Sequence, residues 1–233
     1  MQLSILLTAI LDTTSIATTT LKTTKELPKG MWEMTLAGGI VMIPIFALLL
    51  IAIFITIQKA ILINKAGKLD DNFMSSIKDM VLNDNIVGAQ TLCARTDTPV
   101  SRMLEKGISR IGNPLKNIEV AVENVGKLEV YKLEKGMPFL ATVSGAAPML
   151  GFLGTVTGMI TTFGSIASSG EQVSAGALSG GIYEAMVTTV AGLVVGIFAY
   201  LAYNLLTASI EKVVYKMEAN SIQFLDILQT PSN

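Results

Sequence analysis

Residues 181–204 read GIYEAMVTTVAGLVVGIFAYLAYN and belong to a longer stretch, 185–210, that contains no charged side chain. About 20 apolar residues suffice to cross a bilayer as a helix, so we expect a transmembrane helix over 184–210. Glu184 stands at the head of this helix, with Thr188 and Thr189 about one turn further in. A carboxylate at the edge of hydrocarbon is costly, and such residues usually face a bundle interior or a water-filled cavity. The stretch therefore predicts a membrane span with a polar site in it.

Two further stretches, 34–58 and 136–170, also contain no charge. The chain is 51% hydrophobic and 15% charged, whereas soluble domains carry about 25% charged residues. We predict an all-α membrane protein with three transmembrane helices, over 34–58, 136–167 and 184–210. Aromatic residues are few and strand-type alternation is absent, which argues against a β-barrel.

Lys and Arg are distributed unequally among the connecting segments, and this bias sets the orientation of a membrane protein. The segment 59–135 carries twelve of them and the tail 211–233 two, against three before the first span and none in 168–183. We therefore place the helical region 59–135 and the C-terminus in the cytoplasm. The N-terminal segment 1–33 and the short connection 168–183 then lie outside.

The beginning of the chain leaves two interpretations open. Residues 3–11, LSILLTAIL, are similar to the apolar core of a signal peptide, but no basic residue precedes them. Either this segment is cleaved, or it lies on the membrane surface or against a partner, ahead of a Thr-rich linker.

Reactive side chains are few. The chain has no histidine and one cysteine, Cys93, which excludes an intramolecular disulfide and a CxxC metal site. Histidine is the commonest metal ligand and general base, and we find no nucleophile–base pair without it. We expect no enzymatic activity, no metal and no cofactor, and Cys93 reads as a small apolar residue on a helix. A net charge of −1 gives no reason to expect nucleic-acid binding.

The region 59–135 has the start signals of several helices. Asp70 and Asp71 can cap a helix that runs to about Leu82. Two further helices are expected to start where an N-cap residue is followed by proline, at Thr98-Pro99 and at Asn113-Pro114.

Spans two and three are predicted to extend into the cytoplasm as long amphipathic helices. One leads into span two, with a kink expected near Pro138, and the other follows span three. Their apolar positions recur in steps of three and four: Leu115, Ile118, Val122, Val125 and Leu128, and then Ile210, Val214, Met217, Ser221 and Phe224. We interpret both stripes as surfaces for packing between helices or subunits.

Small residues form one stripe in each of spans two and three. Steps of four and three keep each stripe on one helix face: Ala147, Gly151, Gly154, Gly158, Thr161 and Ser165, and then Ala185, Thr189, Gly192, Gly196 and Ala199. Small residues let membrane helices approach closely. We expect the two spans to pack through Gly151, Gly154, Gly158, Gly192 and Gly196.

Polar residues accompany these stripes. Thr155 and Thr162 lie seven residues apart beside the stripe of span two, and Glu184 and Thr188 share one side of span three. Thr189 lies about 140° around the helix from Glu184, so Glu184 and Thr188 form a separate polar edge. For each threonine, a hydroxyl bonded to its own helix is the alternative to a pore-lining role. For Glu184 the alternative is an interface residue favoured by the helix dipole.

The segments APMLGFLGTVTGMITTF and GGIYEAMVTTVAGLVVGIFAYLAYN, separated by a short connection, strongly resemble the ExbB/TolQ/MotA proton-channel family. The resemblance covers roughly residues 136–210. Three spans with a large cytoplasmic insertion are similar to the ExbB and TolQ branch, since MotA-like members have a fourth span.

The resemblance implies a multi-pass protein of the bacterial cytoplasmic (inner) membrane that forms a homopentamer around a pore in the lipid bilayer. In this family the pore encloses an ExbD/TolR-like single-span protein with a membrane aspartate, and work passes to a TonB/TolA-like protein that reaches the outer membrane. Thr155 and Thr189 match the family's pore threonines, and Glu184 matches its acidic position. Thr188 and Thr162 complete the candidate pore-lining set.

We expect this chain to supply hydroxyls and its partner to supply the carboxylate that is protonated. Hydroxyls hold water and exchange hydrogen bonds, but they do not change charge at physiological pH. The alternatives are a channel that works without a partner and a structural scaffold without its own ion path. The sequence does not separate ExbB-type import, TolQ-type envelope maintenance and gliding or secretion motors, and the resemblance alone favours protons over sodium.

Overall fold

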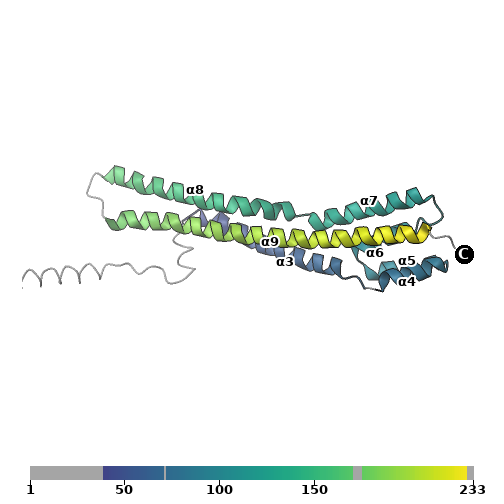
Figure 1. Cartoon of the computed structure of the whole chain (residues 1–233). Helices are drawn as coiled ribbons and strands as arrows, with labels where there is room; N and C mark the ends of the chain where they lie inside the picture. The colour runs from purple at the N-terminus through teal and green to yellow at the C-terminus, as the bar shows by residue number, and fades with distance from the viewer. Residues whose placement is uncertain (1–38, 71, 170–174, 230–233) are drawn as a thin grey trace, which may run out of the picture.

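The computed structural model describes residues 39–70, 72–169 and 175–229, which form an elongated all-helical bundle (Figure 1). Two long antiparallel helices lie side by side, α8 (Met137–Ser169) and α9 (Ala175–Gln229), and α3 (Met42–Gly67) packs along α9. The remaining helices gather toward one end of the bundle: α4 (Phe73–Leu82), α5 (Ile86–Thr96), α6 (Pro99–Ile108) and α7 (Leu115–Glu134), which continues the line of α8.

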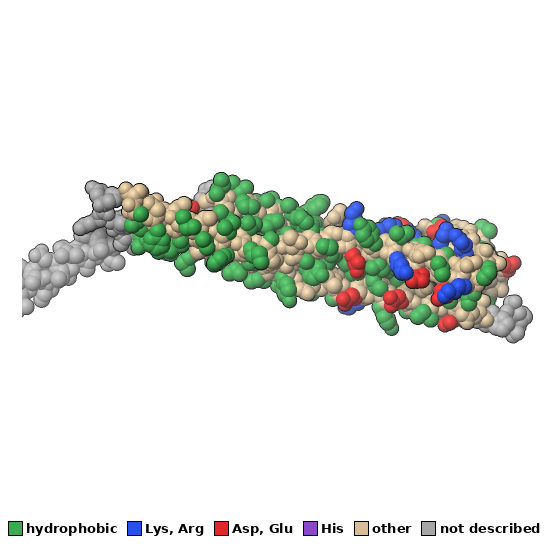
Figure 2. All heavy atoms as spheres, turned by 90° about the horizontal axis from the view of Figure 1, so that it is seen from above, with side chains coloured by type: hydrophobic (Ala, Val, Ile, Leu, Met, Phe, Trp, Pro, Cys, Tyr) green, Lys and Arg blue, Asp and Glu red, His purple; other side chains and the backbone are tan. Residues whose placement is uncertain are grey.

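Within the described residues, three helical segments are long and apolar enough to cross a membrane: Met42–Gly67, Leu115–Ser168 and Leu178–Gln229. The prediction of an all-α protein with three apolar helices is confirmed. Figure 2 shows that, on the face it presents, hydrophobic side chains cover one end of the bundle and charged side chains gather at the other. These segments run past the predicted spans, so the membrane boundaries themselves remain predictions, and the predictions for residues 1–33 lie outside the described residues.

Helix α3 has the surface of a lipid-facing span. It begins at Met42, so Pro44 lies in its first turn, where a missing backbone N–H costs nothing. Large apolar side chains cover its outward face: Ile43, Phe46, Leu50, Phe54, Ile57 and Ile61.

Thr98 begins α6 as predicted. Its hydroxyl accepts a hydrogen bond from the Ser101 N–H at 3.2 Å, and the Ser101 hydroxyl oxygen accepts one from the Thr98 N–H at 2.9 Å. Pro99 is the first residue of the helix. This reciprocal capping satisfies two backbone donors that the helix itself leaves without partners.

Two other predicted caps are wrong. Helix α4 ends at Leu82 as expected, but Asn72 precedes it, and the Asp70 carboxylate accepts a hydrogen bond from the Asn72 N–H ahead of the helix. Helix α7 follows Pro114, whose backbone is extended, while the Asn113 amide donates back to the Arg110 carbonyl. In both places the side chain closes the preceding turn and the helix starts a residue or two later.

Helix α5 is the helix expected around Cys93, but its start was not predicted, although the cap is a local signal. The Asn85 side chain accepts a hydrogen bond from the Gly88 N–H at 3.0 Å, as asparagine often does at a helix start. Cys93 lies fully buried on this helix. Burial, with a smaller contribution from Glu105, raises the pKa of its thiol to about 12, so the thiol stays protonated and unreactive.

The break between α7 and α8 lies at Gly136, not at Pro138. Gly136 has φ +93°, a left-handed conformation that glycine adopts without strain, and Pro138 is the second residue of α8. Lys59 of α3 stabilises this break. Its buried ammonium donates hydrogen bonds to the carbonyls of Lys132 and Leu133, both at 3.0 Å, where α7 leaves its last carbonyls unpaired.

Of the ten residues in the two predicted apolar stripes, five are buried, four are half-buried and one is exposed. Ile118 and Val122 of α7 are buried, as are Ile210, Met217 and Phe224 of α9. Leu128, in contrast, is 61% exposed. Measured around the helix axis, Leu128 lies about 80° from Ile118. Glu129 lies only about 20° from Ile118, and it is Glu129 that is buried.

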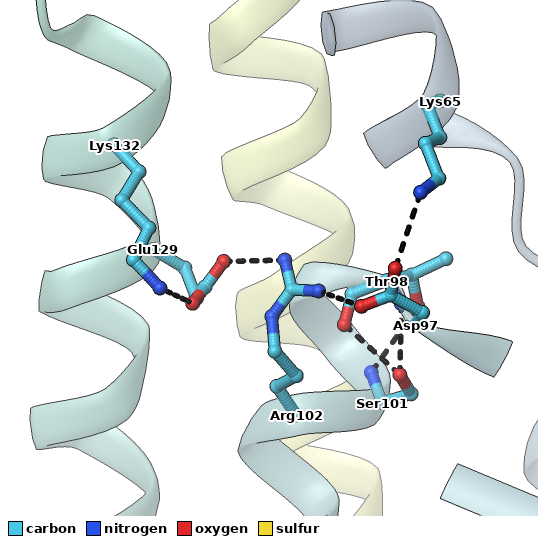
Figure 3. Close-up of polar contacts among 7 residues, drawn as sticks. All are labelled: Lys65, Asp97, Thr98, Ser101, Arg102, Glu129 and Lys132. Atoms are coloured by element: carbon cyan, nitrogen blue, oxygen red, sulfur yellow. Dashed lines mark hydrogen bonds and ion pairs between the residues drawn. The ribbon is translucent and has the colours of Figure 1, made fainter. Parts of the chain in front are cut away.

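Glu129 is the centre of an ion cluster that joins α7 to α6 and α3 (Figure 3). Its side chain is 4% exposed and accepts hydrogen bonds from Arg102 and Lys132, both at 2.6 Å. Arg102 also binds Asp97, which in turn binds Lys65 of α3 at 3.1 Å. Burial acts to raise the pKa of the Glu129 carboxyl, but the two hydrogen-bonded cations outweigh it and hold the pKa below its usual value.

We expect Glu129→Gln to destabilise the protein at pH 7 by about 2 kcal/mol, because it removes an anion that two cations bind. A carboxyl whose folded pKa is depressed stabilises above its unfolded pKa and loses this contribution as pH falls through the folded pKa. The difference between the wild type and Glu129→Gln should therefore shrink below about pH 4. Denaturant unfolding of the detergent-solubilised chain at pH 7, 5 and 3, followed by circular dichroism, measures it.

Glu123→Gln is the matched control, since Glu123 is exposed on the same helix and pairs only with Lys127. This variant should unfold like the wild type throughout. A Glu129→Gln effect that stays constant from pH 7 to pH 3 would contradict the assigned role of the carboxylate.

Candidate functional site

The membrane halves of α8 and α9 meet through glycines. A Cβ placed on Gly192 would lie 2.5 Å from the Ala147 carbonyl oxygen and 2.9 Å from the Gly151 Cα. One placed on Gly151 would lie 2.8 Å from the Thr188 carbonyl oxygen. Real Cβ atoms do not come this close to backbone, so the two backbones touch here and only glycine fits at both positions.

The other glycines of the predicted stripes also lie at this seam. Gly154 faces the Thr188 side chain, Gly158 faces Ala185, and Gly196 faces Pro148. The last two residues of the α8 stripe, Thr161 and Ser165, do not lie in the seam, since both are exposed.

Two of the candidate pore threonines are brought together at the edge of this seam. The hydroxyls of Thr155 and Thr189 contact each other, and both side chains are half-buried. The Thr155 hydroxyl also lies 3.1 Å from the Ala185 carbonyl oxygen, and the Thr189 hydroxyl lies 3.2 Å from that of Gly151. Two hydroxyl protons thus face more acceptors than they can serve at once, so the pair can rearrange its hydrogen bonds or bind water.

Thr188 is placed differently from its neighbour. It is 2% exposed, and its hydroxyl donates to the Ala185 carbonyl at 2.7 Å, inside the seam. From the sequence we expected Thr188 on a separate polar edge with Glu184, and Thr189 within the small-residue stripe as a pore candidate. The structure leaves Thr189 half-buried at the margin of the seam but buries Thr188 against Gly154, because the close approach of Gly151 and Gly192 fixes the rotation of α9.

Thr162 lies two turns from the hydroxyl pair, toward the end of α8. Its hydroxyl donates to the Gly158 carbonyl at 2.8 Å and lies against Gly181 of α9. Gly181 was not among the predicted residues. It lies one step of four before Ala185, so a longer reading of the small-residue stripe would have included it.

Glu184 is exposed and stands apart from the hydroxyl pair. Its carboxylate lies beside Gly39, just ahead of α3. A Cβ on Gly39 would be 2.6 Å from its Oε1, and Gly39 has φ +64°. Glu184 therefore lies between α9 and the head of the first span.

The chemistry of this site is that of hydroxyls and backbone carbonyls. In the part of the chain that the structure describes, no three His, Cys, Asp or Glu side chains are grouped so as to hold a metal ion. The arrangement can hold water and share protons in hydrogen bonds, and it offers an uncharged polar surface to a partner.

This fold and site define a class: multi-pass helical membrane proteins with a hydroxyl site between two closely packed spans. Residues 95–219 match the MotA/TolQ/ExbB proton channel family, and the chain belongs to this family.

Individual relatives agree with this assignment. The chain is similar to the ExbB-like 1 protein of Synechocystis sp., with 28% identity over 74% of this chain and 69% of the relative. It is also similar to the biopolymer transport protein ExbB of Neisseria meningitidis, with 29% identity over 73% of this chain and 84% of the relative. The Tol-Pal system protein TolQ of Pseudomonas aeruginosa is 36% identical over 43% of each chain.

We expect Gly192→Ala to destabilise the α8–α9 pair by about 1–3 kcal/mol. The added methyl group would clash with backbone atoms, which cannot move aside as a side chain can by changing its rotamer. The thermal stability of the purified protein in detergent measures the loss. Gly145→Ala is the control, since a Cβ on Gly145, which lies on the partner helix α8, meets nothing within 4 Å. Equal stability of the two variants would refute the close approach.

Proposed function

We propose that this chain is the pore-forming subunit of a motor in the bacterial inner membrane that is driven by the proton-motive force. The hydroxyl contact between Thr155 and Thr189 at the edge of the α8–α9 seam is the observation that supports this proposal best. It is a polar site built by two apolar helices, and it lies within residues 95–219, the part of the chain that matches a proton-channel family.

The proton-carrying group is supplied from outside this chain. Thr155 and Thr189 stay uncharged at physiological pH, and the charge-free stretches 136–170 and 185–210 contain no group that titrates near neutrality. We propose that an ExbD/TolR-like single-span protein places its membrane aspartate against the hydroxyl pair. The hydroxyls and their water would stabilise the ionised carboxylate until it takes up a proton.

Several copies of this chain, five by family resemblance, would surround the partner helix. Loading and release of a proton on its aspartate would then drive rotation or piston motion of the partner, which passes work to a TonB/TolA-like protein. The chain has no catalytic role in this scheme, and we propose that it is not an enzyme.

Glu184 would act at the outer side, where its exposed carboxylate lies between α9 and the head of α3. In this place it would organise proton entry or a polar contact between helices. Thr188 is buried inside the seam, and Thr162 lies two turns from the hydroxyl pair and is bonded to its own helix, so we assign both to packing rather than to the proton path.

A Tol-type role in envelope maintenance is the second candidate. It is favoured by the TolQ relatives, which are 36% identical over the stretches they share with this chain. The physical mechanism at the hydroxyl pair would be the same, and the protein that receives the work would differ.

We expect the double variant Thr155→Val/Thr189→Val to lose most proton flux, by about tenfold or more, because valine keeps the shape but removes the hydrogen bonds that hold water and carboxylate. Flux into vesicles that contain the chain together with its co-purified partner measures this. Thr157→Val is the control, since Thr157 is exposed and its hydroxyl binds only its own helix. Normal proton flux in the double variant would indicate that the chain is a structural scaffold without its own ion path. Full flux in vesicles that lack the partner would indicate a channel that works by itself.

Glu184→Gln separates the two roles of that residue. We expect it to lower flux while the oligomer survives in detergent, since glutamine keeps the size and hydrogen bonding but not the charge. Size-exclusion chromatography and vesicle flux are measured on the same preparation. If Glu184→Gln leaves the flux intact but weakens the oligomer, the role of Glu184 is in packing and not in transport.

A further inference from the structure

A groove with a volume of about 510 Å³ lies beside the break between α7 and α8, where both helices face α9. Its floor is apolar and includes Val130, Met137 and Val214. Apolar surface in a cleft of this size is typical of a binding site rather than of a solvated helix face.

The rim of the groove is acidic. Glu134, Glu211 and Glu218 line it, all three are exposed, and no Lys or Arg is among the lining residues. Among the described residues, other carboxylates make the ion pairs, so no described Lys or Arg contacts these three carboxylates. Tyr215, 72% exposed, adds an aromatic face on which a cation can rest.

A second pocket, on the side of α7 that faces α3, provides a contrast. Its volume is about 210 Å³, and Glu129 and Asp97 pair there with Arg102, Lys132 and Lys65. This cluster is neutralised from within, whereas the larger groove presents charge of one sign only.

The groove lies on the same face as the hydroxyl pair. Thr207, which lines the groove, is five helical turns from Thr189 on α9, and Met137 is five turns from Thr155 on α8. Both helices are continuous over these intervals and run antiparallel, so the two displacements point to the same end of the bundle (Figure 1). A helix laid along this face from the hydroxyl pair therefore reaches the groove after about 27 Å, or about 18 residues.

We propose that the groove docks the cytoplasmic juxtamembrane segment of the single-span partner, as an amphipathic helix that carries Lys or Arg about five turns from its membrane carboxylate. This inference rests on the proposed function. Single-span helices carry their Lys and Arg on the cytoplasmic side, which gives the partner the charge that the rim lacks. The apolar floor takes the opposite face of the same helix.

The first test uses the full chain in detergent and a fluorescein-labelled 18-residue helical peptide of Leu and Lys, with all Lys on one face. The wild type should bind it, and Glu134→Gln/Glu211→Gln/Glu218→Gln should weaken binding about tenfold, since three charge pairs are lost. The control triple, Asp79→Asn/Glu119→Gln/Glu123→Gln, removes the same charge from exposed sites outside the groove and should change binding no more than about twofold. No binding, or equal weakening in both triples, overturns the proposal.

The second test uses the complex with the co-expressed partner and a photo-crosslinking amino acid in place of Tyr215. A crosslink to a basic segment of the partner, about 18 residues from its membrane carboxylate, is the expected result. Tyr131, 65% exposed on α7 but outside the groove, is the control position and should not give this product. A crosslink from position 215 to a second copy of this chain, in place of the partner, overturns the proposal.

The peptide measurement requires neither ion flux nor a partner. Failure of the proposed function would appear in the Thr155 and Thr189 variants, whereas failure of the groove would appear in the peptide measurement.

Discussion

The contact of α8 with α9 at Gly151 and Gly192 is the constraint on which the membrane half of this protein depends. Lipid tails are as apolar as leucine, so two spans in a bilayer are held by close packing rather than by the hydrophobic effect. Because no Cβ separates the backbones there, the carbonyl of Gly151 comes within reach of the Thr189 hydroxyl and the hydroxyls of Thr155 and Thr189 meet. The polar site thus arises from the packing: the glycines that join the helices also open backbone acceptors to side chains of the neighbouring helix.

In the other half of the bundle, buried charges join the helices in addition to an apolar core. Lys59 of α3 binds carbonyls at the end of α7. Lys65 of α3 binds Asp97, which is linked through Arg102 to Glu129. The first span is therefore connected to the neighbouring helices at two points. Both Lys59 and Glu129 are buried, and each has two partners at hydrogen-bonding distance. Losing one partner of such a pair costs far more than losing a surface pair, because the remaining charge stays buried.

Local and periodic patterns made much of this structure predictable. Long apolar stretches predicted the three membrane helices, Thr98-Pro99 the start of α6, and the steps of four and three the glycines at the α8–α9 seam. The failures depend on contacts between distant residues. The break at Gly136 is stabilised by Lys59 from another helix, Glu129 occupies a core position because Arg102 reaches it, and Thr188 rather than Thr189 is buried because a backbone contact sets the rotation of α9. None of these pairings leaves a pattern in the local sequence, although helical spacing alone places Glu129, and not Leu128, on the side of Ile118.

The two long arms of the bundle differ in stiffness. Helix α9 is unbroken over 55 residues, a rod of about 82 Å, whereas α7 and α8 are separate segments joined at Gly136. If α9 tilts as a rigid rod at Thr189, Phe224, about 52 Å further along the helix, is displaced as well. If the bundle bends, we expect it to bend at Gly136 between α7 and α8, so that a small displacement within the membrane would become a larger sideways movement at the charged end.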